Sequence, residues 1–428
     1  MKLFKQQGAA GLLVQQLAQQ LLLVALLAGT VTQAQVAPPP AALRDELVAP
    51  LRAAQELLAE KKFPQALEQL SATDGIAGKT KVETYFVERL RAAAASGAGN
   101  TQQAATSLEA VLASGMVPGD DQVKLVDALA GAHYNLKHYR DAARWAIRSL
   151  EIGPRDENRA AMRQMAAQSL YLDSDYQGAV QQLQALQKEQ IASGLPTPEA
   201  QLDMLAGSYI KLNDDAGYMQ VLEQLVRGYP RADYWADLLV RLERKPGFSP
   251  RLVIDLFRLQ LAANAMAEAA DYLELAQLAA QADFPAEAKK VLETGFAAKV
   301  LGAGADAEKH RRYLQQVSER AAAQDGRAPA TAAATAAKAG ATGSDALFKA
   351  GYIEVTLGRV ESGLALMQQA MDQGGLAQPD ETRIRLGAAY AQAGDKARAR
   401  ALFDAVLKAG GADGAADLAR LWSLLIAR

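Results

Sequence analysis

The chain has 428 residues, half of them apolar and only 6% aromatic, with a formal net charge of −2. A nucleic-acid-binding protein would need a basic stripe, which this near-neutral sequence lacks. Cysteine is absent, which excludes disulfides, thiolate metal sites and cysteine nucleophiles. Alanine and leucine are strong helix formers and dominate the composition, so we expect an all-α protein.

The first 34 residues have the pattern of a secretory signal peptide. Lys2 and Lys5 give a positive start, residues 21–28 are apolar, and small residues precede a cleavage point after Ala34. An uncleaved membrane anchor is the alternative, but this apolar run is shorter than the roughly 20 residues that a membrane span requires. We therefore expect a bacterial, periplasmic protein with no stable transmembrane span after signal removal.

Four segments should follow the signal peptide. Prolines 38–40 stiffen an extended lead-in over residues 35–50. An N-terminal array of about seven helix pairs plus an extra helix should occupy 51–323. An alanine-rich linker over 324–344 then precedes a C-terminal helix pair with a capping helix over 345–428.

A triplet of residues recurs along the chain. It consists of a small residue, a second small residue 12 positions later and a large apolar residue 16 positions later. Copies start 35–39 residues apart, with one interval of 75, close to the period of roughly 34 of helix–turn–helix repeats. The nine copies are Ala54/Ala66/Leu70, Ala92/Ala104/Leu108, Ala130/Ala142/Ala146, Ala167/Ala179/Leu183, Ala206/Tyr218/Leu222, Arg241/Val253/Phe257, Ala276/Ala288/Leu292, Gly351/Gly363/Met367 and Gly387/Ala399/Phe403.

Packing explains this pattern. The two helices of a pair cross where the first two triplet residues meet, because long side chains there would force them apart. Arg241 and Tyr218 break the small-residue rule, so we expect their pairs to be locally splayed. Turn-forming residues fall between the two helices of a pair. They are Lys61-Lys62-Phe63, Gly99-Asn100, Lys137-His138, Asp173-Ser174-Asp175, Asn213-Asp214-Asp215, Asp283-Phe284-Pro285 and Gly394-Asp395.

The interval of 75 residues is irregular. A charged helix is predicted over 306–323, whereas 324–344 has no large apolar residue and should be a linker or a solvated helix. We place a sub-domain boundary there. The last helix, from about Asp413, carries one apolar stripe and should cap the exposed edge of the array. That stripe consists of Leu418, Leu421, Trp422 and Leu425.

Motifs for chemistry are scarce. Gly78-Lys79-Thr80 is similar to the end of a phosphate-binding loop, but Thr73 stands where that motif needs glycine, so we interpret it as an inter-repeat loop. His133 and His138 are five apart, unlike the four-residue spacing of zinc-binding helices, and His133 should be a packed, hydrogen-bonded histidine. His310 lies in a charged run that we expect to be solvated. We expect no enzymatic activity, no cofactor and no metal.

The remaining candidate is a concave groove lined by the first helix of each pair. Tyrosine and glutamine there would suit an extended peptide, because they combine flat contact area with hydrogen bonds that reach a backbone. Ordinary inter-repeat packing or solvated surface is the alternative. The candidate residues are Tyr134, Tyr171, Ile210 and Lys245, joined by Asp127, Gln164, Gln168 and Asp203.

The segment from Leu386 through Asp395 to Phe403 resembles a tetratricopeptide repeat, and the resemblance covers roughly residues 51–428. It implies a right-handed α-solenoid of antiparallel helix pairs. Four shorter segments look like a family of secreted proteobacterial repeat proteins, relatives of which are linked to TonB-type energy-transduction systems. That resemblance implies no catalytic or binding residue. The segments are Tyr234–Asp237, Lys245–Phe248, Phe284–Lys290 and Ala416–Trp422.

The sequence thus predicts a periplasmic scaffold or adaptor for proteins or peptides of the cell envelope, and the resemblance implies an accessory role beside a TonB-type system. Nucleic acid is not an expected partner. An accessory or ligand-binding subunit for peptidoglycan or polysaccharide export is the alternative, and a purely structural spacer is a third.

Overall fold

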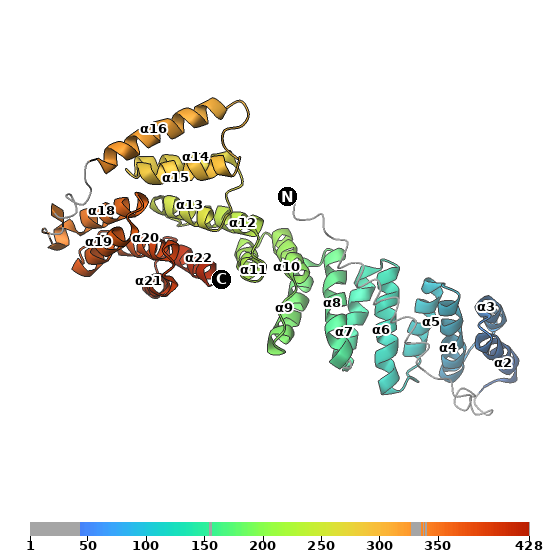
Figure 1. Ribbon diagram of the computed structural model, residues 1–428. Helices are drawn as coiled ribbons and strands as arrows, with labels where there is room; N and C mark the ends of the chain where they lie inside the picture. The colour runs from blue at the N-terminus through green and yellow to red at the C-terminus, as the bar shows by residue number, and fades with distance from the viewer. Residues whose placement is uncertain (1–42, 154–155, 327–334, 337, 339, 428) are drawn as a thin grey trace. The chain divides into compact units, whose positions relative to one another are not determined.

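The computed structural model describes residues 43–427 except 154–155, 327–334, 337 and 339 (Figure 1). The predicted signal peptide, its cleavage after Ala34 and residues 35–42 of the lead-in lie outside the described residues. Twenty α-helices and two 3-10 helices, and no strand, are found among the described residues. The predicted all-α class is therefore confirmed.

The chain divides into two compact units between Tyr218 and Met219. Each unit is a succession of helices, and most helices pack mainly on their neighbours in sequence. Unit 1 contains α2 (Asp45–Ala59), α3 (Phe63–Ser71), α4 (Lys81–Gly97), α5 (Thr101–Ala113), α6 (Gly119–Asn135), α7 (Tyr139–Ile152), α8 (Asp156–Leu172), α9 (Tyr176–Ala192) and α10 (Glu199–Leu212). The division falls inside α11 (Asp215–Gly228).

Unit 2 contains an equally long succession of helices. They are α12 (Ala232–Glu243), η3 (Pro250–Leu252), α13 (Val253–Ala262), α14 (Ala269–Gln281), α15 (Pro285–Ala297), α16 (Ala307–Asp325), η4 (Gly340–Gly343), α18 (Ser344–Thr356), α19 (Val360–Gln373), α20 (Pro379–Gln392), α21 (Lys396–Ala409) and α22 (Ala415–Ile426). The predicted extra charged helix corresponds to α16. The first helix starts at Asp45, so the last six residues of the predicted lead-in are helical.

The small crossing residues behave as predicted. Every triplet residue is buried except Arg241 and Val253. The tightest crossing joins α18 and α19, where a Cβ on Gly351 would lie 2.8 Å from the Gly363 carbonyl oxygen. Side chains larger than hydrogen would push these two backbones apart.

The triplet that begins at Arg241 is the one that fails. Helix α12 buries Tyr234, Trp235, Leu238, Leu239 and Leu242 instead. Arg241 donates a hydrogen bond to Asp237 at 3.2 Å along the side of the helix. The reason is the connection: residues 244–249, which include Pro246 and Gly247, lengthen the turn before η3, so the two helices do not cross at Arg241.

The turns at the predicted positions share one geometry, which the turn between α6 and α7 illustrates. Lys137 has a positive φ of 60°, and the His138 N–H donates to the His133 carbonyl oxygen at 2.9 Å. The Lys137 N–H donates to the Tyr134 carbonyl oxygen at 3.0 Å. This is a Schellman motif, which satisfies the last carbonyls of the helix and brings residues five apart in sequence side by side. The predicted turns are all confirmed.

The loop at Gly78-Lys79-Thr80 has a structural role. Thr80 caps α4 in a reciprocal capping box with Glu83. The same Glu83 carboxylate accepts hydrogen bonds from the Arg44 backbone N–H and from its guanidinium, at 3.1 and 2.8 Å. Arg44 precedes α2, so this cluster ties the first helix to the second repeat, and the inter-repeat interpretation is confirmed.

The predicted sub-domain boundary at 324–344 is not where the contacts divide the chain. Helix α15, before this segment, packs against α18, after it. Across the same segment, Tyr352 Oη donates a hydrogen bond to Glu287 Oε1 at 3.0 Å. The helices on both sides of the segment are therefore in contact with each other. Residues 327–334, 337 and 339 lie outside the described residues, so the linker over 324–344 stays a prediction.

Helix α22 does more than cap an edge. Phe403 stacks on Trp422 with ring centroids 6.0 Å apart, as expected for a terminal helix on α21. However, α22 also packs on α13, and the Ser249 N–H donates to the Asp413 carbonyl oxygen at 2.8 Å. Helix α22 therefore also contacts the α12–α13 connection, in addition to covering α21 as predicted.

Candidate peptide-binding surface

Two tyrosine pairs occupy equivalent positions in consecutive repeats of unit 1. Tyr134 meets Tyr139 with ring centroids 5.7 Å apart, and Tyr171 meets Tyr176 at 5.5 Å, both edge to face. Each pair spans the end of one helix and the start of the next, so the Schellman turn sets its geometry. All four side chains are partly exposed. The pairs thus form two aromatic platforms one repeat apart.

The phenols of Tyr134 and Tyr171 remain protonated at physiological pH. Burial raises the pKa of Tyr134 to about 12, and the neighbouring Tyr139 adds to the effect. Burial also raises the pKa of Tyr171, with a smaller contribution from Tyr176. A neutral phenol can both donate and accept a hydrogen bond, so both tyrosines can act as polar contacts as well as flat apolar ones.

Two glutamines on α8 share a stripe with Tyr171. Gln164, Gln168 and Tyr171 follow one another at helical spacing, four and three residues apart. The Oε1 atoms of both glutamines are buried and have no hydrogen-bond partner among the described residues. A buried acceptor without a hydrogen bond raises the free energy of the folded protein.

The other predicted residues of unit 1 differ in exposure. Asp127 is only 3% exposed and accepts a hydrogen bond from Ser149 Oγ at 2.5 Å. It lies between α6 and α7 and offers no free surface. The equivalent residue on α10, Asp203, is exposed, and Ile210 on the same helix is 41% exposed. The predicted stripe is therefore buried at α6 and open at α10.

Lys245 belongs to unit 2, whereas the other predicted residues belong to unit 1. It lies two residues beyond Glu243, the last residue of α12. Its Nζ pairs with Asp417 Oδ2 at 2.6 Å. This ion pair holds the α12–α13 connection against α22, which gives Lys245 a structural role within its own unit.

A buried ionic cluster in unit 2 was not expected from the sequence. Asp255 and Arg258, three residues apart on α13, are 2% and 7% exposed and lie 2.7 Å apart. Arg258 also pairs with Glu287 of α15 at 2.7 Å. Arg385 of α20 pairs with Asp255 at 3.0 Å. The spacing of Asp255 and Arg258 is a signal for an ion pair, but nothing local indicates that it is buried.

The charged groups of this cluster pair with one another. Burial alone would lower the pKa of Arg258, but Glu287, Tyr352 and Asp255 together raise it well above its usual value. Burial raises the pKa of the Tyr352 phenol, which donates a hydrogen bond to Glu287. The guanidinium of Arg258 also stacks on the Tyr352 ring, 4.8 Å from its centroid. Because these groups pair with one another from different helices, they hold those helices together, and we call the cluster the ionic clamp.

The helix pairs, their small crossing residues and their shared turn give the chain a fold of the tetratricopeptide-repeat type. No family model and no curated protein matches the sequence. Similar solved structures include a Naa15/Naa10 complex bound to HypK-THB, the TPR domain of P58(IPK), and the C-terminal part of a TPR repeat-containing protein from Cytophaga hutchinsonii. Each is 12% identical to this chain.

The TM-scores of these matches are 0.35, 0.20 and 0.24, in the same order. The matches cover 85%, 88% and 86% of this chain, and 63%, 98% and 98% of the other chains. The chain therefore spans less than two thirds of the first of them. Similarity this low carries no argument about function. Among the described residues, no helix combines the length and apolarity needed to cross a bilayer.

Proposed function

We propose that the protein is a non-catalytic scaffold that binds extended peptide segments of partner proteins on unit 1. The observation that carries this proposal is the repeated tyrosine pair, at Tyr134 and Tyr171, beside the unpaired Oε1 atoms of Gln164 and Gln168. Tyrosine supplies rigid contact area at low entropic cost, which is why it is enriched in binding hot spots.

An extended peptide fits this surface because its backbone presents N–H donors at regular intervals. A small rotation of Gln164 or Gln168 would let Oε1 accept one of these donors, which would remove the cost of leaving the acceptor unpaired. Ile210, 41% exposed on the next first helix, offers an apolar contact at the more open end. The partner chemistry proposed is thus a segment with aromatic or apolar side chains and a free backbone edge.

The place of action proposed is the bacterial cell envelope. The support is the sequence pattern of residues 1–34, with Lys2, Lys5 and the small residues before the cleavage point after Ala34. An accessory role beside a TonB-type system is the finer proposal and rests on the resemblance of short segments alone. Cell fractionation and the intact mass of the exported protein test the location.

The test of the peptide surface is site-specific photo-crosslinking. A photoreactive residue at Gln164, on α8, should crosslink to partner peptides that mass spectrometry can identify in living cells. Replacing Tyr134 and Tyr171 with alanine should reduce this crosslinking at least about tenfold, as loss of two hot-spot residues would. The matched control is Tyr313→Ala, which removes a partly exposed tyrosine of unit 2.

Two results would reject the proposal. Crosslinking that survives both tyrosine changes, with unchanged helical circular dichroism, would place the partner elsewhere. A melting temperature raised by muropeptides or polysaccharide and unaffected by peptides would favour the alternative, a glycan-binding subunit. A structural spacer would show neither response.

A further inference from the structure

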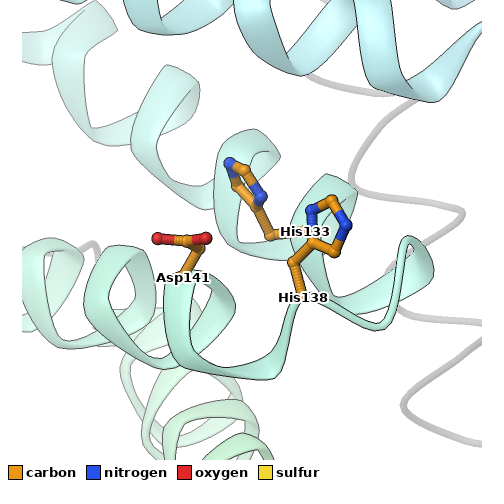
Figure 2. A group of neighbouring side chains, drawn as sticks. All are labelled: His133, His138 and Asp141. Atoms are coloured by element: carbon orange, nitrogen blue, oxygen red, sulfur yellow. The ribbon is translucent and has the colours of Figure 1, made fainter.

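His133, His138 and Asp141 converge at the turn between α6 and α7 (Figure 2). His133 lies in the last turn of α6, His138 caps α7, and Asp141 is in the first turn of α7. One ligand atom from each side chain lies within 4.8 Å of the other two. The sequence spacing of five argued against a metal site, but the Schellman turn removes that objection by placing the two imidazoles 5.9 Å apart, centroid to centroid.

The same turn recurs along the chain, which provides internal comparisons. Other turns bring together Leu170 with Asp175, Tyr209 with Asp214, and Tyr390 with Asp395. None of these three pairs offers two imidazole ligands. The α6–α7 turn therefore combines a common backbone geometry with side chains that suit a transition metal.

The surroundings of His133 leave one of its ring nitrogens available as a metal ligand. It is 6% exposed, and its Nε2 lies 3.2 Å from Glu109 Oε1 on α5. A carboxylate at this distance accepts a hydrogen bond from Nε2–H, and in a neutral imidazole this leaves the lone pair on Nδ1. That Nδ1 is buried and has no hydrogen-bond partner among the described residues. A carboxylate that orients a histidine in this way is the usual outer support of a metal-binding imidazole.

We propose that His133, His138 and Asp141 bind a divalent transition metal ion of the zinc type, with Glu109 as a positioning residue. Two imidazoles and one carboxylate are a ligand set that zinc accepts, with a water molecule in the fourth position. Tetrahedral coordination with bonds near 2.1 Å needs ligand atoms about 3.4 Å apart. His138 is exposed and Asp141 partly exposed, so their side chains can close this gap.

The positive charge of Arg144 should weaken metal binding, so removing Arg144 should have the opposite effect to removing a ligand. Its Nη2 lies 3.2 Å from Asp141 Oδ1 and 3.6 Å from Glu109 Oε1. The guanidinium competes with a cation for the first carboxylate and weakens the negative charge of the second. Removing it should strengthen metal binding, whereas a surface that collects metal nonspecifically would show no such gain.

The experiment titrates the full chain with Zn²⁺ by calorimetry and with Co²⁺ by visible absorption, which reports coordination geometry. We expect one ion per chain. His138→Ala and Asp141→Asn change exposed side chains and should leave the fold intact while weakening binding more than about tenfold. Glu109→Gln should weaken it about tenfold, and Arg144→Gln should strengthen it severalfold. Controls are His310→Gln and Asp173→Asn, which remove a histidine and a carboxylate outside the site.

The proposal is overturned if wild-type protein does not bind Zn²⁺ at millimolar concentration. It is also overturned if His138→Ala and Asp141→Asn bind as tightly as wild type, or if the controls lose as much affinity as they do. The proposal does not depend on the peptide surface. Loss of crosslinking in the tyrosine variants with intact metal binding, or the reverse, separates the two.

Discussion

The two units use the same helix pairs but hold them together differently. In unit 1, clusters of small apolar residues join neighbouring helices, such as Ala130, Ala146 and Ala166 with two methionines. Its ion pairs also join neighbouring helices, as between Arg163 of α8 and Glu189 of α9, 26 residues apart. In unit 2, Arg385 binds Asp255 across 130 residues, and Lys245 binds Asp417 across 172.

This difference shows that a repeat sequence does not have to produce a purely linear stack. A linear array needs only contacts between neighbours, which is what unit 1 displays. Unit 2 adds contacts between elements far apart in sequence, and charged side chains buried in the process must pair with one another. Its stability should therefore depend on single buried charges, whereas that of unit 1 should depend on the volume of its small residues.

The largest expected effect is in the ionic clamp. Arg258→Met should destabilise unit 2 by about 3–5 kcal/mol, because Glu287 would lose the arginine that it pairs with and the buried Asp255 would keep only Arg385. Urea unfolding followed by tryptophan fluorescence measures this in a Trp145→Phe background, where Trp235 and Trp422 report on unit 2 alone.

The matched control for Arg258→Met is Arg311→Met, in the same unit. Arg311 pairs with Glu308, but its side chain is 61% exposed, so its loss should change stability by less than about 0.5 kcal/mol. Equal effects of the two changes would mean that the clamp is not the basis of the difference between the units.

The next effect is steric and falls in unit 1. Ala167 is fully buried where α8 crosses its neighbours, so Ala167→Leu should cost about 1–3 kcal/mol through overpacking. Trp145 fluorescence, with Trp235 and Trp422 replaced by phenylalanine, follows unit 1. Ala160→Leu, at an exposed position of the same helix, should be nearly neutral, and a similar cost at both positions would contradict the packing argument.

The smallest effect concerns pH and the start of unit 1. Hydrogen bonds from Arg44, and then from the Thr80 backbone, lower the pKa of Glu83 to about 2. The folded pKa lies below the unfolded value near 4.3, so the stabilisation is complete above that value and is lost as the pH falls toward 2. Glu83→Gln should cost about 1–2 kcal/mol at neutral pH.

The same variant should flatten the acid dependence of unit 1 stability between pH 5 and pH 2. Melting curves over this range measure the change. Glu68→Gln, at an exposed position of α3, is the control and should keep the acid dependence of wild type. If the acid dependence of Glu83→Gln equals that of wild type, Glu83 is not the source of this dependence.

Local features were predictable because their causes are local. Lys137 and Ser174 both adopt the positive φ of the turns where turn residues were predicted. Failures arose where burial is decided by distant segments. His310 was expected to be solvated, yet it is 8% exposed and accepts a hydrogen bond from the Gly302 N–H at 3.3 Å. Charged neighbours in sequence do not reveal which face of a helix another helix covers.

The candidate surface was predictable only in part. Tyr134 and Tyr171 follow from the repeat period, since each stands four residues after a small crossing residue. Their partners, Tyr139 and Tyr176, come from the next helices and were not anticipated. Asp127 fits the same period but is buried against Ser149, because the sequence period specifies a position on the helix and does not specify what covers it.

The sequence by itself determined that this chain folds into helix pairs with tight turns, because helix propensity, small crossing residues and turn residues act over a few tens of positions. The tertiary structure alone decided that Asp255, Arg258 and Arg385 meet in one buried cluster, and that two histidines five residues apart face each other beside Asp141. Such meetings depend on backbone geometry and long-range packing, and neither the spacing nor the identity of the residues specifies them.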